Sequence, residues 1–215
     1  MAMTSTPQHN DFYEILRNNI KKLSDQFDQI QSDRKALLKE LSGFIKEKIK
    51  ANQKIELTFI CTHNSRRSHI AQIWAQTAAH YYGIKNVDTF SGGTEATAFN
   101  PRAVLAMRQA GFDINKKQDG VNPVYEVRYA HDASPLTIFS KKYDDDFNPR
   151  KGFAAIMTCS HADENCPLVI GAAARIALTY NDPKDFDGTP HEAAKYMERV
   201  HEVGREILYA FSVVK

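Results

Sequence analysis

This sequence lacks long apolar runs, a strong excess of one charge and a large number of cysteines. No segment approaches the roughly 18 consecutive apolar residues of a membrane-spanning helix, and the polar residues 1–10 lack the apolar core of a signal peptide. A net charge of +2 gives no reason to expect nucleic acid or an anionic membrane surface as a partner. These absences predict a cytoplasmic protein.

The three cysteines are Cys61, Cys159 and Cys166. An odd count without repeated spacing is a poor disulfide framework, and in a reducing compartment such cysteines tend to be catalytic, metal-binding or redox-active. Zinc prefers four ligands in close pairs, and the spacing here is poor for that even with His161 nearby. The aspartates at 144–146 are interpreted as a solvated loop. No metal ligand is therefore predicted.

The hydrophobic periodicity divides the chain at about residue 52. Residues 11–50 repeat apolar positions at helical spacing and predict an antiparallel helical hairpin. We therefore expect an N-terminal helical extension over 1–52 and an α/β domain over 53–215. The hairpin is expected to pack on the main domain, and the alternative is a homodimer interface or a lid.

Strands and helices alternate from residue 54 onward. Strands are expected at 54–60, 87–91, 152–158 and 175–180, and helices at 66–82, from Asn100–Pro101 to Gly111, and from Thr189–Pro190 with Glu192 in a capping box. This alternation predicts an α/β fold with a four-stranded parallel sheet flanked by helices. Residues 121–150 interrupt the pattern with two β-rich runs, which we interpret as an inserted β-hairpin.

The stretch CTHNSRRS, residues 61–68, joins the first strand to the following helix. Such a loop directs backbone N–H groups at one point, where the helix N-terminus adds partial positive charge, so it can bind a tetrahedral oxyanion. The same field would stabilise the Cys61 thiolate, Arg67 can fork two anion oxygens, and Ser68 can donate to the sulfur. The candidate substrate-binding residues are Thr62, His63, Asn64, Ser65, Arg66, Arg67 and Ser68. A buried structural cysteine is the disfavoured alternative, because too many parts coincide.

Transfer of an oxyanion to sulfur also requires an acid for the leaving oxygen. Asp182 follows the fourth strand, and Pro183 biases its backbone toward an extended conformation. An ordinary turn is the alternative. Because ligands of parallel sheets lie beyond the carboxyl ends of the strands, Cys61, Cys159 and Asp182 are expected to share one crevice.

Cys159 and Cys166 are seven positions apart. In a continuous helix that spacing spans about 10 Å, whereas a disulfide tolerates Cα atoms up to about 7 Å apart. If the segment is helical when reduced, forming this disulfide must unwind it and expose the new bond to a reductant.

Four motifs, ICTHNSRRS, FSGGTEATAFNPRAVLAM, TCSHADENCP and NDP, together resemble the low-molecular-weight protein tyrosine phosphatase superfamily, and most closely its thioredoxin-coupled arsenate reductases. The resemblance covers roughly residues 54–212. It implies that Cys61 attacks arsenate held by Arg67 while Asp182 protonates the departing oxygen. Cys159 then attacks Cys61 and releases arsenite, and Cys166 attacks Cys159 to leave a disulfide that thioredoxin reduces.

The resemblance implies no organic cofactor. Some members bind a potassium ion near the loop asparagine and the serine that ends the second strand, which match Asn64 and Ser91. Gln72 stands where an acidic ligand is used, and Arg66 stands where a second loop cysteine is common.

A protein tyrosine phosphatase that hydrolyses phosphomonoesters is the alternative function and would use the same Cys61, Arg67 and Asp182. Phosphatases of this kind commonly carry a tyrosine pair after the acid, where this chain has Lys184, Asp185 and Phe186. The tyrosines Tyr125, Tyr129 and Tyr143 are candidates for the wall of an aromatic slot, although we favour their packing within the hairpin. A non-catalytic scaffold is the third interpretation, which the intact nucleophile, arginine and acid disfavour.

Overall fold

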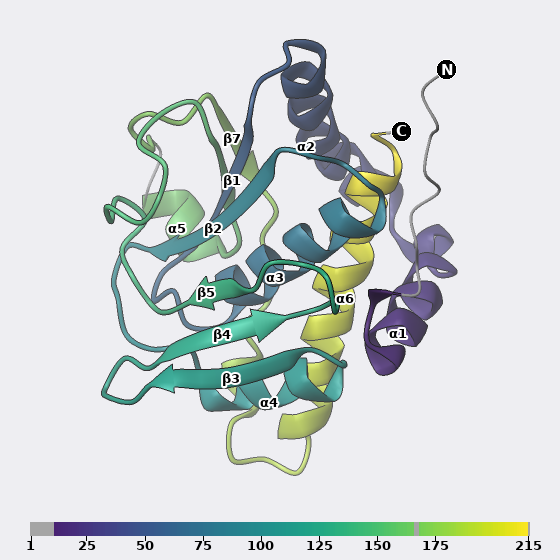
Figure 1. Cartoon of the computed structure of the whole chain (residues 1–215). Helices are drawn as coiled ribbons and strands as arrows, with labels where there is room; N and C mark the ends of the chain where they lie inside the picture. The colour runs from purple at the N-terminus through teal and green to yellow at the C-terminus, as the bar shows by residue number, and fades with distance from the viewer. Residues whose placement is uncertain (1–10, 166–167, 215) are drawn as a thin grey trace.

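Four parallel strands form the central sheet of the computed structural model, which describes residues 11–165 and 168–214 (Figure 1). The strands are β1 (Ile55–Cys61), β2 (Val87–Gly93), β6 (Ala154–Met157) and β7 (Ala174–Ala177), in the order β2-β1-β6-β7. Every pairing is parallel. The predicted α/β class and four-stranded parallel sheet are therefore confirmed, and the carboxyl ends of all four strands face one edge.

Both faces of the sheet are covered, as expected for parallel strands. Ile156 of β6 belongs to a large buried cluster with α3 (Arg67–Tyr81), α4 (Pro101–Gln109) and α6 (Glu192–Ser212), whereas Met157 belongs to a second cluster with Ala162 of α5 (Ser160–Asn165). Successive strand residues point to opposite faces. The period-2 alternation therefore places α5 across the sheet from α3.

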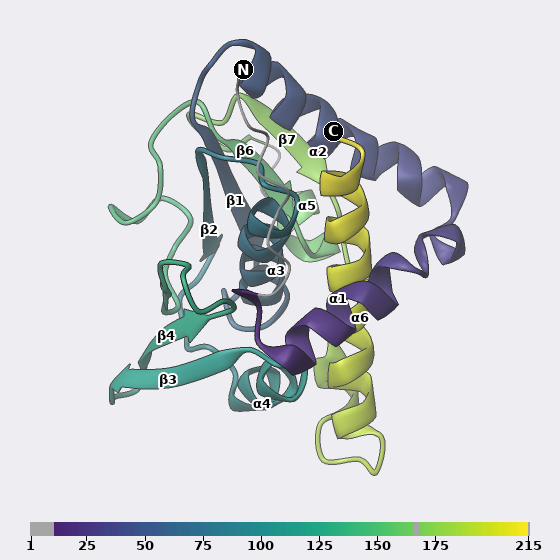
Figure 2. The same cartoon turned by 45° about the vertical axis from the view of Figure 1, so that its right-hand side comes forward.

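The N-terminal segment forms α1 (Glu14–Ser24), a short η2 turn (Phe27–Gln29) and α2 (Ser32–Lys50). Figure 2 shows the two long helices diverging in a V instead of running antiparallel, and each packs on α6. Their buried leucines and isoleucines join the large cluster of the main domain. The V arises because α6 offers a long apolar face to both helices.

The predicted inserted hairpin is present as β4 (Val124–Arg128) and β5 (Leu136–Ile138). A strand that the sequence analysis missed, β3 (Asp113–Gln118), pairs with β4 and makes a three-stranded antiparallel sheet. Its sequence DINKKQ is almost entirely polar and exposed, with only Ile114 buried, so it lacks the alternation that marks a strand.

Two boundaries differ from the sequence-based expectations. Helix α6 begins at Glu192, not at Thr189–Pro190, and the Glu192 carboxylate accepts a hydrogen bond from the Gly188 amide at 2.6 Å. Strand β2 continues past Ser91 to Gly93. The expected cap of α4 is confirmed, since the Asn100 side chain accepts from the amides of the first turn. None of the helices in the described part of the chain is long and apolar enough to cross a membrane.

Candidate active site

The loop at 61–68 connects β1 to α3. One asparagine, Asn64, holds the conformation of this loop. Asn64 is fully buried with φ of 44°, a left-handed conformation that asparagine tolerates. Its Oδ1 accepts the Lys141 amide at 2.8 Å, and its Nδ2 donates to Ser68 Oγ at 2.9 Å. Side-chain to backbone bonding by Asn64 therefore fixes the loop, as such residues commonly do.

Cys61 is the last residue of β1, and its Sγ lies 3.1 Å from Ser68 Oγ. Ser68 Oγ already accepts a hydrogen bond from Asn64, so its own proton is free to point at the sulfur. A donor aimed at sulfur is what a thiolate nucleophile requires. Gly93 makes room for the loop, because a Cβ there would lie 2.6 Å from Thr62 O and 2.7 Å from Asn64 N.

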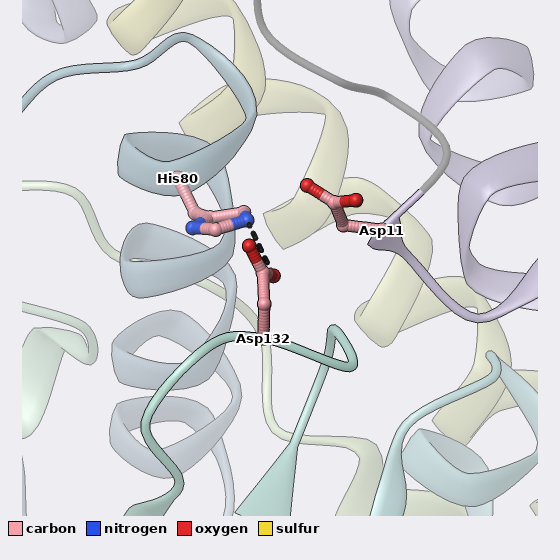
Figure 3. A group of neighbouring side chains, drawn as sticks. All are labelled: Asp11, His80 and Asp132. Carbon is pink, nitrogen blue, oxygen red and sulfur yellow. Dashed lines mark ion pairs between the residues drawn. The ribbon is translucent and has the colours of Figure 1, made fainter.

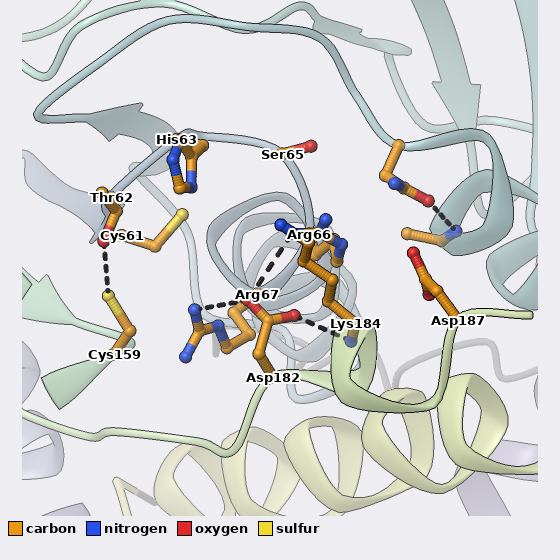
Figure 4. Close-up of polar contacts among 12 residues, drawn as sticks. Cys61, Thr62, His63, Ser65, Arg66, Arg67, Cys159, Asp182, Lys184 and Asp187 are labelled. Carbon is orange, nitrogen blue, oxygen red and sulfur yellow. Dashed lines mark hydrogen bonds and ion pairs between the residues drawn. The ribbon is translucent and has the colours of Figure 1, made fainter. Parts of the chain in front are cut away.

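The side chains of Arg67 and Asp182 contact each other beside the loop (Figure 4). Arg67 Nη2 donates to Asp182 Oδ2 at 2.7 Å, and Arg67 Nη1 donates to the Tyr180 carbonyl at 2.8 Å. Asp182 also caps the short η3 helix (Pro183–Phe186), since its Oδ1 accepts the Lys184 amide at 3.1 Å. An entering anion must compete with Asp182 for Arg67.

A small hollow brings several of the predicted site residues together. It is lined by Cys61, His63, Ser65, Arg66, Arg67 and Asp182. Cys61 and Asp182 therefore converge at the carboxyl edge of the sheet, as the sequence analysis expected. Cys159, which was expected in the same crevice, is not among the lining residues.

Arg66 points inward and not to solvent. It is 9% exposed, its Nε donates to Tyr196 Oη at 3.2 Å, and its Nη1 lies 3.5 Å from Asp182. Tyr196 Oη in turn donates to Asp187 Oδ1 at 2.8 Å, and burial first, then this bond, raises the pKa of Tyr196 to about 12. Asp182 therefore has a guanidinium on each side, and the neutral Tyr196 phenol holds one of them.

The remaining loop residues serve mainly as framework. Ser65 Oγ donates to Ala98 O at 2.7 Å, and the backbone carbonyl of His63 accepts from Thr97 Oγ1 at 3.0 Å. The His63 ring is half exposed and lies 3.7 Å from Glu95.

Cys159 follows β6 and is 1% exposed. Its Sγ lies 3.5 Å from Thr62 Oγ1 and accepts the Ala162 amide at 3.4 Å, at the start of α5. Thr62, the neighbour of Cys61, thus connects the two cysteines, and Figure 4 shows Thr62 beside both. The segment 160–165 is helical, as the unwinding argument assumed. Cys166 lies outside the described residues.

The side chains expected at a potassium site have other partners. Asn64 is bonded as above, and Ser91 Oγ lies 3.0 Å from His69 Nδ1. Gln72 Nε2 donates to Thr89 O at 2.8 Å, while its Oε1 is buried without a hydrogen-bond partner among the described residues. The ammonium of buried Lys141 also acts on this region, because it contributes to lowering the pKa of His69 after burial itself. The positive charge of Lys141 disfavours a cation in this region, and no chemical step is assigned to potassium.

The hairpin tyrosines do not all face the hollow. Tyr125 and Tyr129 are buried in the large cluster, where Tyr125 packs edge-on against Phe99 and Tyr129 against His80. These two residues pack against the main domain, and not within the hairpin as favoured from the sequence, because the buried cluster of the domain extends under the inserted strands.

A cluster of potential metal ligands lies elsewhere. Asp11, His80 and Asp132 each place one ligand atom within 4.8 Å of the others (Figure 3). His80 is near the end of α3, about 20 Å along the helix from Arg67. We assign no metal to this group, because exposed carboxylates commonly gather without one.

Tyr180 and Tyr196 are site residues that sequence reasoning missed. Tyr180 acts through its backbone carbonyl, which carries no side-chain signature, although its position directly before Asn181–Asp182, at the end of the strand expected at 175–180, was a usable signal. Tyr196 reaches the loop from α6, where its spacing identifies it only as part of the apolar stripe.

Comparison with known proteins identifies relatives of this chain. A family model described as low molecular weight phosphotyrosine protein phosphatase matches residues 56–123. A Bacillus licheniformis protein named arsenate reductase is 31% identical over 150 residues, which cover 69% of this chain and 89% of that protein. A Halalkalibacterium halodurans protein of the same name is 29% identical over 157 residues, covering 73% and 94%.

Solved structures of the same kind overlap more loosely. A thioredoxin-dependent arsenate reductase from Corynebacterium glutamicum has a TM-score of 0.43 and 18% identity, covering 93% of this chain and 87% of that one. A low molecular weight phosphotyrosine phosphatase from Vibrio cholerae O395 has a TM-score of 0.49 and 12% identity, covering 74% and 95%. Both scores are below 0.5, so nothing further follows from them. The Bacillus licheniformis match, at 31% identity across 89% of that protein, shows that this chain is an enzyme of the low molecular weight phosphotyrosine protein phosphatase family, to which it belongs together with bacterial arsenate reductases.

Proposed function

We propose that this enzyme reduces arsenate to arsenite, with Cys61 as nucleophile and thioredoxin as the final reductant. The observation that carries the proposal is that Cys61, Arg67 and Asp182 line the same hollow. Cys159 is close to Cys61, because its Sγ lies 3.5 Å from Oγ1 of Thr62, the residue that follows Cys61. The relatives named arsenate reductase support the choice of substrate.

The first step forms a bond between Cys61 sulfur and arsenic. The loop amides and Arg67 bind the arsenate oxygens, while Ser68 donates to the attacking sulfur. One oxygen leaves arsenic as water, with a proton from Asp182. Arg67 exchanges its contact with Asp182 for the anion, and Arg66 keeps a guanidinium 3.5 Å from the carboxylate.

The second step transfers two electrons to arsenic. Cys159 thiolate attacks the Cys61 sulfur, the sulfur–arsenic bond breaks with its electron pair on arsenic, and arsenite leaves a Cys61–Cys159 disulfide. Cys166 thiolate then attacks Cys159 and frees Cys61. A thioredoxin dithiol reduces the resulting Cys159–Cys166 disulfide and is itself oxidised.

Hydrolysis of phosphomonoesters is the second candidate, because the same three residues form the phosphatase machinery and the family model is that of a phosphatase. The burial of Tyr125 and Tyr129 removes two of the proposed walls of an aryl slot. We therefore expect weak activity on aryl phosphates.

The test is arsenate-dependent NADPH oxidation with purified thioredoxin and thioredoxin reductase. Wild-type protein should turn over many times, whereas Cys61→Ser and Cys166→Ser should not. Efficient aryl phosphate hydrolysis without arsenate turnover would replace the reductase with a phosphatase.

A further inference from the structure

An ion pair joins the N-terminal extension to the main domain beside the site. Arg34, in the first turn of α2, directs its Nε and Nη2 at Glu206 Oε2 of α6, at 2.9 and 2.8 Å. The Arg34 side chain is 18% exposed and that of Glu206 is 7% exposed. Because burying two charges costs about as much as their attraction returns, such a pair is weak evidence for stability by itself. It does fix the guanidinium in one place.

That guanidinium lies over the aromatic ring of an active-site neighbour. Its Cζ is 4.7 Å from the ring centroid of Tyr180, the geometry of a cation–aromatic contact. Tyr180 is 5% exposed. Burial raises the pKa of its hydroxyl, and Glu206 raises it further while Arg34 lowers it. The Arg34–Glu206 pair therefore acts on both the face and the hydroxyl of this buried ring.

The backbone of the same residue touches the catalytic arginine. The Tyr180 carbonyl accepts Arg67 Nη1 at 2.8 Å, and its amide donates to Thr158 O at 3.2 Å. Asp182 follows two positions later. Because the ring and the carbonyl belong to one residue, a shift of the whole Tyr180 residue would displace both the carbonyl that bonds Arg67 and the start of the segment that carries Asp182.

We propose that Arg34 is a positioning residue of the active site: by clamping Tyr180 against the domain, it aims Arg67 at the oxyanion and sets the place of Asp182. The N-terminal extension then forms a supporting wall of the site. This inference rests on the roles given to Arg67 and Asp182 in the proposed function.

The test measures how inorganic phosphate protects Cys61 from iodoacetamide, followed by peptide mass spectrometry at a temperature where every variant is folded. Arg34→Met should raise the dissociation constant of phosphate about tenfold, because small misplacements of a binding group are costly. Arg34→Lys keeps a cation beside the ring and should recover part of the affinity. Lys35→Met is the matched control: Lys35 lies on the same turn, 5.7 Å from the Tyr209 ring centroid, and its loss should leave phosphate binding unchanged.

Arg34→Met leaves Glu206 buried without its partner, so a second variant guards against a simple folding defect. Arg34→Met combined with Glu206→Gln removes both charges and still lacks the cation over Tyr180, and it should show the same loss. If phosphate affinity is unchanged in both variants and only the melting temperature falls, Arg34 merely holds α2 on α6. That result would overturn the inference.

The readout does not depend on turnover. If wild-type protein fails to reduce arsenate but phosphate still protects Cys61, the proposed function fails while the role of Arg34 is still judged by the variants. If phosphate does not protect wild-type Cys61, both ideas are overturned.

Discussion

Arg67 and Asp182, the candidate anion-binding arginine and the candidate acid, are bonded to each other at 2.7 Å. Both residues line the small hollow beside Cys61. In the proposed function, substrate binding is therefore an exchange of partners, in which the anion takes Arg67 from the carboxylate.

Replacing Asp182 should separate binding from chemistry. Asp182→Asn removes the proton donor and should lower kcat by about 10²–10⁴-fold, the usual contribution of a general acid. The same change frees Arg67 from its carboxylate partner, so phosphate should protect Cys61 at lower concentrations than in wild type. Steady-state kinetics and alkylation protection check the two halves. A loss of anion binding together with kcat would show that Asp182 is needed to shape the site.

Replacing Arg67 tests the forked geometry. Arg67→Lys keeps a positive charge but loses the two parallel donors and the bond to the Tyr180 carbonyl. We expect kcat/KM for arsenate to fall about 10²–10³-fold, similar to the loss of a main oxyanion donor. A variant within a few-fold of wild type would mean that charge alone is sufficient.

Ser68 should increase the reactivity of the Cys61 sulfur. Ser68→Ala removes the hydroxyl 3.1 Å from Sγ, so the sulfur loses a hydrogen-bond donor and iodoacetamide should react more slowly with Cys61 near neutral pH. Ser65→Ala is the control, because Ser65 Oγ bonds Ala98 O and not the sulfur. Equal alkylation profiles for wild type and Ser68→Ala would contradict this role.

Lys141 should make stability depend on pH. Burial lowers its pKa from 10.5 to about 8, opposed by Asp145, while Lys141 is 2% exposed. Between pH 8 and pH 10.5 the unfolded chain keeps the proton on this lysine, whereas the folded chain has lost it. The free energy of unfolding should therefore increase with pH across this range, by roughly 3 kcal/mol. Below pH 8 both states are charged and the full penalty applies.

Lys141→Met should remove that dependence. The variant should be more stable than wild type at pH 7, with the difference shrinking toward pH 10.5, as measured by urea unfolding across the range. The Lys141 amide still bonds Asn64, so the loop is kept. A wild-type stability that does not rise above pH 8 relative to the variant would contradict a charged, buried lysine.

Much of this site can be predicted from short contiguous stretches of the sequence. The strand, the loop at 61–68 and the helix after it are contiguous, so one pattern predicts the nucleophile, its donor and the arginine together. The Asn100 cap of α4 is equally local. Asp182 required the further argument that parallel strands end at one edge.

What escaped prediction depends on contacts between distant segments. The role of Tyr180 lies in a backbone carbonyl, and Arg34 reaches Glu206 across 172 positions of the chain. Strand β3 is stabilised by pairing with β4 and not by its own polar sequence. The start of α6 was misplaced because Glu192 bonds the Gly188 amide from the first residue of the helix, not from its third.

The most direct test of the central claim is one round of arsenate reduction by Cys166→Ser without any reductant, followed by disulfide mapping. The account predicts about one arsenite per chain and a trapped Cys61–Cys159 disulfide, because the second attack on sulfur has no thiolate to perform it. Absence of arsenite, with both cysteines still free, would contradict a redox role for Cys61 and Cys159.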